Sequence, residues 1–182
     1  MSLAIALFGL TSVIHLHAAS LAGVTRPDTA QIGSTTLVLN GLGLRTKHMV
    51  KVDVAGLYLP QKSSDAVAIF NADVPKRIVM HFLHGASKKR DERCIRRVVQ
   101  RQYAGWEEDD AGRYRTHARR AGARQGRRPD GLHVRSGTGT TLAINGNDKM
   151  TIAGPAFGRM LFSVWLGPKP PNAGLKKGIL GQ

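Results

Sequence analysis

Three features of the sequence contain residue types that do chemistry in other proteins, but their spacing fits none of the usual sites. His81 and His84 stand three positions apart on a predicted strand and therefore point to opposite faces, which makes them a poor pair of metal ligands. Cys94 has no general-base partner in a recognisable triad pattern. The Gly-Thr-Gly-Thr-Thr run at 137–141 lacks the lysine of a phosphate-binding loop and precedes a predicted strand, which indicates a turn. We therefore expect no metal site and no cofactor.

Residues 88–136 differ in composition from the sequence on either side. This segment contains 13 of the 17 arginines and the only cysteine, and its 15 Lys+Arg against 7 Asp+Glu supply about half of the net charge of +15. Clustered arginines bind the phosphates of nucleic acids, so a basic nucleic-acid-binding arm is one interpretation. The acidic run at 107–110 interrupts the arm, and the N-terminal sequence argues against access to nucleic acid. We expect no nucleic-acid partner.

The first 22 residues have the features of a secretory signal peptide. An uncharged apolar run at 3–14 precedes mostly small residues at 18–22, in the order of an apolar core and a cleavage zone. The run is too short to span a bilayer as a helix, which needs roughly 20 residues. A buried N-terminal helix is the alternative. We predict that 1–22 is a signal peptide, that 23–182 forms one domain without a stable membrane span, and that the protein is periplasmic or secreted.

The clearest periodicity lies at residues 49–59, which alternate as a strand does until Pro60 ends the pattern. One face carries Val50, Val52, Val54 and Tyr58, and the other carries Lys51, Asp53, Ala55 and Leu57.

The remaining elements surround this strand. In chain order we expect a strand at 35–40 that ends at a turn around Gly41 and Gly43, a short helix at 65–70 capped by Ser63 or Ser64, a strand at 77–83, a hairpin of strands at 140–145 and 149–153 around Asn145 and Gly146, and an amphipathic helix from Pro155 to Trp165. This order predicts an α+β fold with an antiparallel sheet covered by helices.

Four motifs resemble the bacterial chalcone isomerase-like family. They are Asn-Gly-Leu-Gly-Leu-Arg at 40–45, Val-Lys-Val-Asp-Val-Ala-Gly-Leu-Tyr-Leu at 50–59, Trp-Leu-Gly-Pro-Lys-Pro-Pro at 165–171 and Leu-Lys-Lys-Gly at 175–178. The resemblance covers roughly residues 20–87 and 137–181. It implies an open-faced β-sandwich of the chalcone isomerase type, in which helices over a large antiparallel sheet form a ligand cleft.

The resemblance first implies a non-catalytic binder of a small apolar carboxylate such as a fatty acid. Related plastid proteins hold a fatty-acid carboxylate with an arginine, and Arg45 in the Gly-x-Gly-x-Arg pattern resembles that residue. A guanidinium can donate two parallel hydrogen bonds to one carboxylate. The candidate ligand-binding residues are Arg45, Asp53 and Tyr58. The alternative for Arg45 is a solvated position in a loop.

The resemblance also implies an alternative function, an isomerase of the intramolecular-lyase (chalcone-flavanone) type. Plant chalcone isomerases use an arginine, a threonine and a tyrosine in ring closure. Asp53 stands where that threonine would align, and a carboxylate is not the same neutral hydroxyl donor. Its other interpretation is a solvent-facing residue paired with Lys51. The aligned tyrosine would fall within 88–136, so no catalytic residue is assigned.

The family would place an apolar amphipathic helix where the arginine-rich segment begins. Codons compatible with residues 91–104, read one base later, can encode Met-Ser-Ala-Val-Tyr-Asp-Gly-Trp-Phe-Asn-Asp-Asn-Thr-Pro. Those of 130–136 can encode Met-Val-Phe-Thr-Tyr-Val-Pro, which leads directly into 137–141. Our hypothesis is a base slip near codons 87–89 and a second near Arg135 that restored the frame. Residues 88–136 should then pack poorly while both flanks form sheet.

Overall fold

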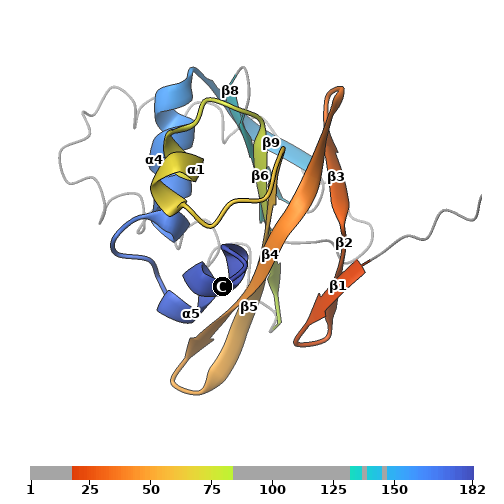
Figure 1. Cartoon of the computed structure of the whole chain (residues 1–182), viewed down its shortest axis with the longest axis vertical. Coiled ribbons are helices and arrows are strands. Elements are labelled where there is room, and N and C mark those ends of the chain that lie inside the picture. Colours follow the sequence, from red (N-terminus) through yellow and green to blue (C-terminus); the bar gives the residue numbers. More distant parts are fainter. Residues whose placement is uncertain (1–17, 84–131, 137–138, 145–146) are drawn as a thin grey trace, which may run out of the picture.

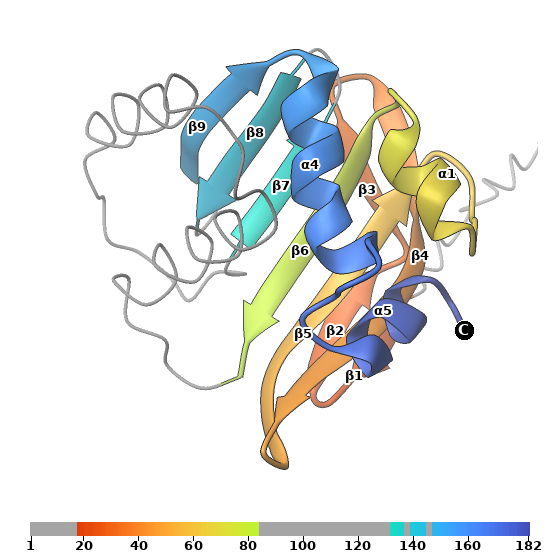
Figure 2. The same cartoon turned by 90° about the vertical axis from the view of Figure 1, so that its left-hand side faces the viewer.

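A seven-stranded antiparallel sheet forms the centre of the molecule, with the order β3-β4-β5-β6-β7-β8-β9. The computed structural model describes residues 18–83, 132–136, 139–144 and 147–182. Three helices of this part cover one face of the sheet, and a small two-stranded sheet lies against the other (Figure 1; Figure 2). The predicted α+β fold with an antiparallel sheet is therefore confirmed.

The strands follow one another along the chain and pair in the same sequence. The large sheet consists of β3 (Thr29–Ile32), β4 (Thr35–Lys47), β5 (Val50–Leu59), β6 (Lys76–Phe82), β7 (Leu132–Ser136), β8 (Gly139–Ile144) and β9 (Asn147–Ala153). The register between β4 and β5 shifts twice, between Leu39 and Gly41 and between Arg45 and Thr46. These irregularities decide which residues of the two long strands face each other.

The helices are α1 (Ala66–Asn71), α4 (Pro155–Leu166) and α5 (Ala173–Ile179). Asp65 caps α1, since its carboxylate accepts hydrogen bonds from the backbone of Val67 and Ala68 at 2.9 and 3.0 Å. The prediction that Ser63 or Ser64 caps this helix was wrong. Ser63, two positions before this cap, instead accepts a hydrogen bond from the backbone N–H of Asp65 itself.

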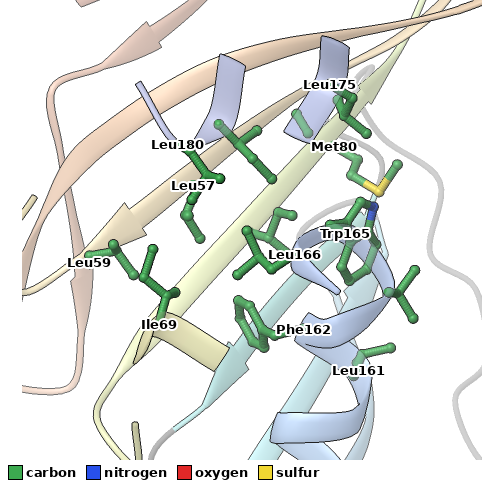
Figure 3. Packing of buried hydrophobic residues seen from close by; sticks show 14 of the residues in the cluster. Leu57, Leu59, Ile69, Met80, Leu161, Phe162, Trp165, Leu166, Leu175 and Leu180 are labelled. Atoms are coloured by element: carbon green, nitrogen blue, oxygen red, sulfur yellow. The ribbon is translucent and has the colours of Figure 1, made fainter. Parts of the chain in front are cut away.

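The main core lies between the sheet and the helices. Period-two alternation turns every second residue of β5 and β6 toward the helices, where they meet the apolar side of α4 and the buried side chains of α5 (Figure 3). The fully or almost fully buried members include Ala55, Leu57, Ile78, Phe162, Leu166, Leu175 and Ile179. Each large side chain removed from water contributes about 1.5 to 3 kcal/mol, so this layer supplies most of the apolar stabilisation.

A smaller cluster lies on the opposite face of the sheet. Leu37, Leu39, Tyr58 and Val79 pack there against Ala19 of the small sheet, which consists of β1 (Ala18–Leu21) and β2 (Val24–Pro27). Sequence periodicity did not predict β1, β2 or β3. Strand β1 occupies the last part of the predicted signal peptide, whereas residues 1–17 lie outside the described part of the chain.

Helix α5 packs directly on the backbone of β4. A Cβ atom on Gly43 would collide with the carbonyl group of Leu175, and one on Gly178 would collide with the carbonyl oxygen of Leu42. Gly41, which also lies under α5, has the same restriction. The prediction that a strand ends at Asn40 and turns at these glycines was therefore wrong, because β4 runs through them to Lys47.

The arginine-rich segment lies mostly outside the described residues, and its predicted poor packing stays a prediction for 88–131. The backbone of Leu132–Ser136 forms β7 between β6 and β8, and the packing of its side chains also stays a prediction. The strands on both sides of Asn145 and Gly146 pair as a hairpin, as predicted, although the two turn residues themselves are not described.

Candidate functional site

An ion pair connects the two long strands on the face of the sheet that the helices cover. Arg45 of β4 and Asp53 of β5 are direct cross-strand neighbours, just before the second register shift. Arg45 Nε donates a hydrogen bond to Asp53 Oδ2 at 2.5 Å. Neighbouring side chains on one face of an antiparallel pair lie close enough for such contacts, so the register itself creates the pair.

The two partners differ in burial and in the atoms that they leave available. Asp53 is fully buried, whereas 19% of the Arg45 side chain is exposed. Among the described residues, Asp53 Oδ1 has no hydrogen-bond partner, and Nε is the one guanidinium nitrogen of Arg45 that makes a hydrogen bond. Both alternative interpretations were wrong: Arg45 is not in a loop, and Asp53 neither faces solvent nor pairs with Lys51.

The ionisation of Asp53 reflects two opposing influences. Burial raises the pKa of the Asp53 carboxyl above its ordinary value, and the positive charge and hydrogen bond of Arg45 act in the other direction without cancelling it. At a given pH, a larger fraction of Asp53 is therefore protonated than of an exposed aspartate. In that form the unpartnered oxygen can carry a proton and donate a hydrogen bond.

The surroundings of the ion pair are largely apolar. Asp53 lies opposite Phe82 of β6, and the next pair along the same face is Ala55 with Met80, both of which belong to the main core. On the other side, Asn172 at the N-cap of α5 donates to the carbonyl oxygen of Thr46 at 3.2 Å. This bond holds the beginning of α5 beside the end of β4 where Arg45 lies. The site thus combines one polar pair with an apolar sheet face.

Tyr58 is not brought together with the other two candidates. Its side chain belongs to the opposite face of the sheet, within the smaller cluster, and its hydroxyl donates to the carbonyl oxygen of Pro27 at 3.0 Å. The distance of five positions between Asp53 and Tyr58 already places them on different faces of one strand. Of the three candidate residues, Arg45 and Asp53 share one site.

Sequence reasoning missed a second buried charge, Lys76 at the beginning of β6. Its ammonium group donates to the carbonyl oxygens of Ile69 at 3.0 Å, Phe70 at 3.5 Å and Ala72, and lies 5.4 Å from the centre of the Phe162 ring. Burial lowers the pKa of this lysine. The ammonium group satisfies the carbonyl oxygens at the C-terminal end of α1. In the sequence, the signal for this contact was a lysine a few positions after a predicted short helix.

The other residues that the sequence analysis considered for chemistry form no metal site among the described residues. His81 lies on β6 opposite Val54, while His84 and Cys94 are outside the described residues. Within the described ranges, no three histidine, cysteine or acidic side chains group as metal ligands would. The helices of the same ranges include none with the length and apolar character of a membrane span.

Comparisons with known proteins agree with this architecture. Residues 18–181 match the family model described as chalcone isomerase-like. No curated protein matches the sequence. Among solved structures, the crystal structure of an Arabidopsis thaliana fatty-acid binding protein superposes with a TM-score of 0.61 and 15% sequence identity, covering 90% of this chain and 96% of that chain. At this identity the likeness shows a shared fold.

Proposed function

The chain belongs to the chalcone isomerase-like family, and from this premise we propose that it is a non-catalytic binder of a small apolar carboxylate, such as a fatty acid. The shared fold with a plant fatty-acid binding protein supports the proposal. The observation that carries it is the ion pair of Arg45 and Asp53, in which a partly exposed guanidinium and one buried carboxyl oxygen are left without partners among the described residues.

The two groups divide the recognition of a carboxylate between them. The guanidinium nitrogens that Asp53 does not use donate to the ligand carboxylate, in the charge-assisted geometry that arginine favours. An ionised Asp53 would repel this ligand. Because burial raises the pKa of Asp53, its neutral form is accessible, and the protonated oxygen then donates a further hydrogen bond to the ligand. Phe82, partly buried beside the pair, offers the first apolar contact to the hydrocarbon chain.

The test compares two arginines in a displacement assay with a fluorescent fatty acid. Arg45→Ala should weaken binding at least tenfold, because a hydrogen bond to a charged group contributes about 1.5 to 3 kcal/mol. Arg159→Ala, which removes an exposed arginine of α4, is the matched control and should leave affinity unchanged. Lipid extracts of the purified protein should contain fatty acid. A ligand-free protein with equal affinities for both variants would refute the proposal.

The alternative is catalysis of the intramolecular-lyase type, which the family description suggests. Asp53 is buried and paired with Arg45 at the position where the resemblance aligns a catalytic threonine. The pair leaves no neutral hydroxyl there to assist ring closure, which favours the binding function. Incubation with a chalcone substrate decides between the two, since turnover above the uncatalysed rate would establish the isomerase.

Two further proposals concern the chain itself. We propose that the protein is exported to the periplasm or secreted, on the basis of the apolar run and small residues at 1–22, and that residues 88–136 reflect a shifted reading frame. N-terminal sequencing of the native protein tests export. Resequencing of the gene in independent isolates, with the intact mass of the native protein, tests the frame, and a repeated clean read of the present frame would refute it.

A further inference from the structure

We propose that the tip of the β4–β5 hairpin, residues 46–51, docks on the surface of an anionic lipid bilayer. The tip is a two-residue turn of His48 and Met49 between the paired residues Lys47 and Val50. It projects beyond α5 at the lower end of the molecule (Figure 1; Figure 2).

The apolar part of the tip is unusually exposed. Met49 is 99% exposed and Val50 is 51% exposed, although the same strand is fully buried from Asp53 onward. His48 and Met49 have φ angles of 47° and 65°, a conformation that glycine and asparagine adopt at lower cost. Neither folding nor core packing explains a large thioether at this position, whereas insertion among lipid chains would bury it.

The charged side chains of the tip itself, Lys47 and Lys51, are both positive. Lys47 lies opposite Val50, Lys51 lies opposite Thr46, and both lysines are exposed. The carboxylate nearest in sequence, Asp53, is buried and paired with Arg45. The other aspartates of the described part of the chain lie on different segments; they are Asp28, Asp65, Asp73 and Asp148. An apolar tip between lysines complements an anionic interface, where the lysines meet headgroups and the apolar side chains enter the acyl boundary.

The size of the apolar patch favours a bilayer over a protein partner. A stable protein interface buries about 800 Å² on each side, and two neighbouring side chains on a narrow turn cannot supply that area. A bilayer requires no complementary shape, because lipid chains adapt to a flexible methionine. The partner that fits the tip is therefore a lipid surface with net negative charge.

Docking at this tip would place the carboxylate site close to the headgroups, a consequence that rests on the proposed function. Arg45 precedes Met49 by four residues on the same hairpin, which corresponds to about 13 Å at the rise of a strand. Interfacial segments bury their apolar side about 5 to 10 Å into the boundary between headgroups and chains. Arg45 would then stand near the depth at which the carboxylate of a membrane-dissolved fatty acid lies.

The experiment measures partitioning of the full chain onto vesicles of phosphatidylcholine alone and of phosphatidylcholine mixed with phosphatidylglycerol. We expect binding to the anionic vesicles. Lys47→Gln with Lys51→Gln should weaken it about 30-fold. The matched double variant, Lys62→Gln with Lys177→Gln, removes the same charge from exposed positions elsewhere and should change it less than about threefold. Equal losses for the two doubles would attribute binding to net charge and overturn the proposal.

A second pair of variants tests the apolar part of the tip. Met49→Asp should weaken binding about tenfold, whereas Val67→Asp, at a 59% exposed position of α1, should have little effect. Met49→Trp should add indole fluorescence that brominated lipids quench. Absence of vesicle binding, or an added indole signal that brominated lipid leaves unquenched, would overturn the proposal. The displacement assay in solution should give Met49→Asp unchanged fatty-acid affinity, so failure of docking and failure of the carboxylate site are distinguishable.

Discussion

Two charged side chains are buried on the same face of the sheet, at opposite ends of the β5–β6 pair, and the protein accommodates them differently. Lys76 begins β6, and its ammonium group is surrounded by three backbone carbonyls at the end of α1. Asp53 lies opposite Phe82, the last residue of β6, and it has one partner and one unpartnered oxygen among the described residues. Burial raises the pKa of Asp53 and lowers the pKa of Lys76, so in each case it favours the neutral form of the side chain.

The difference distinguishes a buried charge whose hydrogen bonds are made within the fold from one that keeps an oxygen without a partner among the described residues. At the Lys76 end the hydrogen-bonding demand is met within the fold, so a ligand has nothing to add. At the Asp53 end a buried oxygen without a partner costs about 1 to 3 kcal/mol, and a ligand that supplies the missing bond recovers part of that cost. This asymmetry leads us to place ligand binding at the Arg45–Asp53 end.

The largest expected effect belongs to the Lys76 end. Lys76→Ala should lower the free energy of unfolding by about 3 kcal/mol, because it leaves the last carbonyls of α1 unsatisfied and removes a buried side-chain stem. Fatty-acid affinity should stay unchanged in the folded fraction. Urea denaturation measures the first quantity and displacement titration the second. A stable variant with impaired binding would reverse the roles of the two ends.

The Arg45→Ala variant should show the opposite balance. Its free energy of unfolding should fall by about 2 kcal/mol, which is less than for Lys76→Ala. The loss is smaller because Asp53, left without its ion-pair partner, can take up a proton and so avoid an unpaired buried charge. Its fatty-acid affinity should fall at least tenfold. Arg45→Lys keeps the charge without the planar fork, so it should restore most of the stability and little of the affinity. Full recovery of affinity in the lysine variant would show that charge alone suffices.

The pH dependence of stability gives a smaller effect with a definite sign. Because the pKa of Asp53 is raised in the folded state, this carboxyl holds more protons in the folded protein than in the unfolded protein above about pH 4. The free energy of unfolding should therefore fall as pH rises from this value through the folded pKa. Subtracting the urea-denaturation curve of Asp53→Asn isolates the slope. Parallel curves for the two proteins across this range would contradict the assignment.

Lys76 should show the reverse slope at alkaline pH, and this is the smallest of the expected effects. Its pKa is lowered in the folded state, so between that pKa and about 10.4 the unfolded chain holds more protons. The free energy of unfolding of the wild type relative to Lys76→Met should rise with pH in this window. A relative decrease would mean that the ammonium form is the better accommodated state.

Much of the sheet could be predicted from alternation, and the errors have physical causes. Residues 49–59 gave the faces of β5 correctly, including the separation of Asp53 from Tyr58. The end assigned to β4 was wrong because Gly41 and Gly43 are typical of turns, whereas here they admit the backbone of α5. Such a close approach depends on residues far away in the sequence, and a local pattern does not contain it.

The site itself was only partly predictable. Arg45 was identified through a family resemblance, and Asp53 through its alignment with a catalytic position. Their pairing depends on the register shift of β4 against β5 between Arg45 and Thr46, which no local periodicity specifies. Lys76 was missed because a buried lysine is rare, and because its partners are backbone carbonyls that a sequence does not distinguish.

The contact between α5 and β4 also has a consequence for the order in which the chain can fold. Asn40 Nδ2 donates to the carbonyl oxygen of Ile179, a residue 139 positions later, at 2.8 Å. A chain made from its N-terminus can form the β4–β5 hairpin early, yet the helix that covers the glycines of β4 is synthesised much later. Closing so long a loop is slow, so we expect the hairpin to form well before α5 covers it. The candidate site at Arg45 and Asp53 should therefore be completed only after α5 has docked.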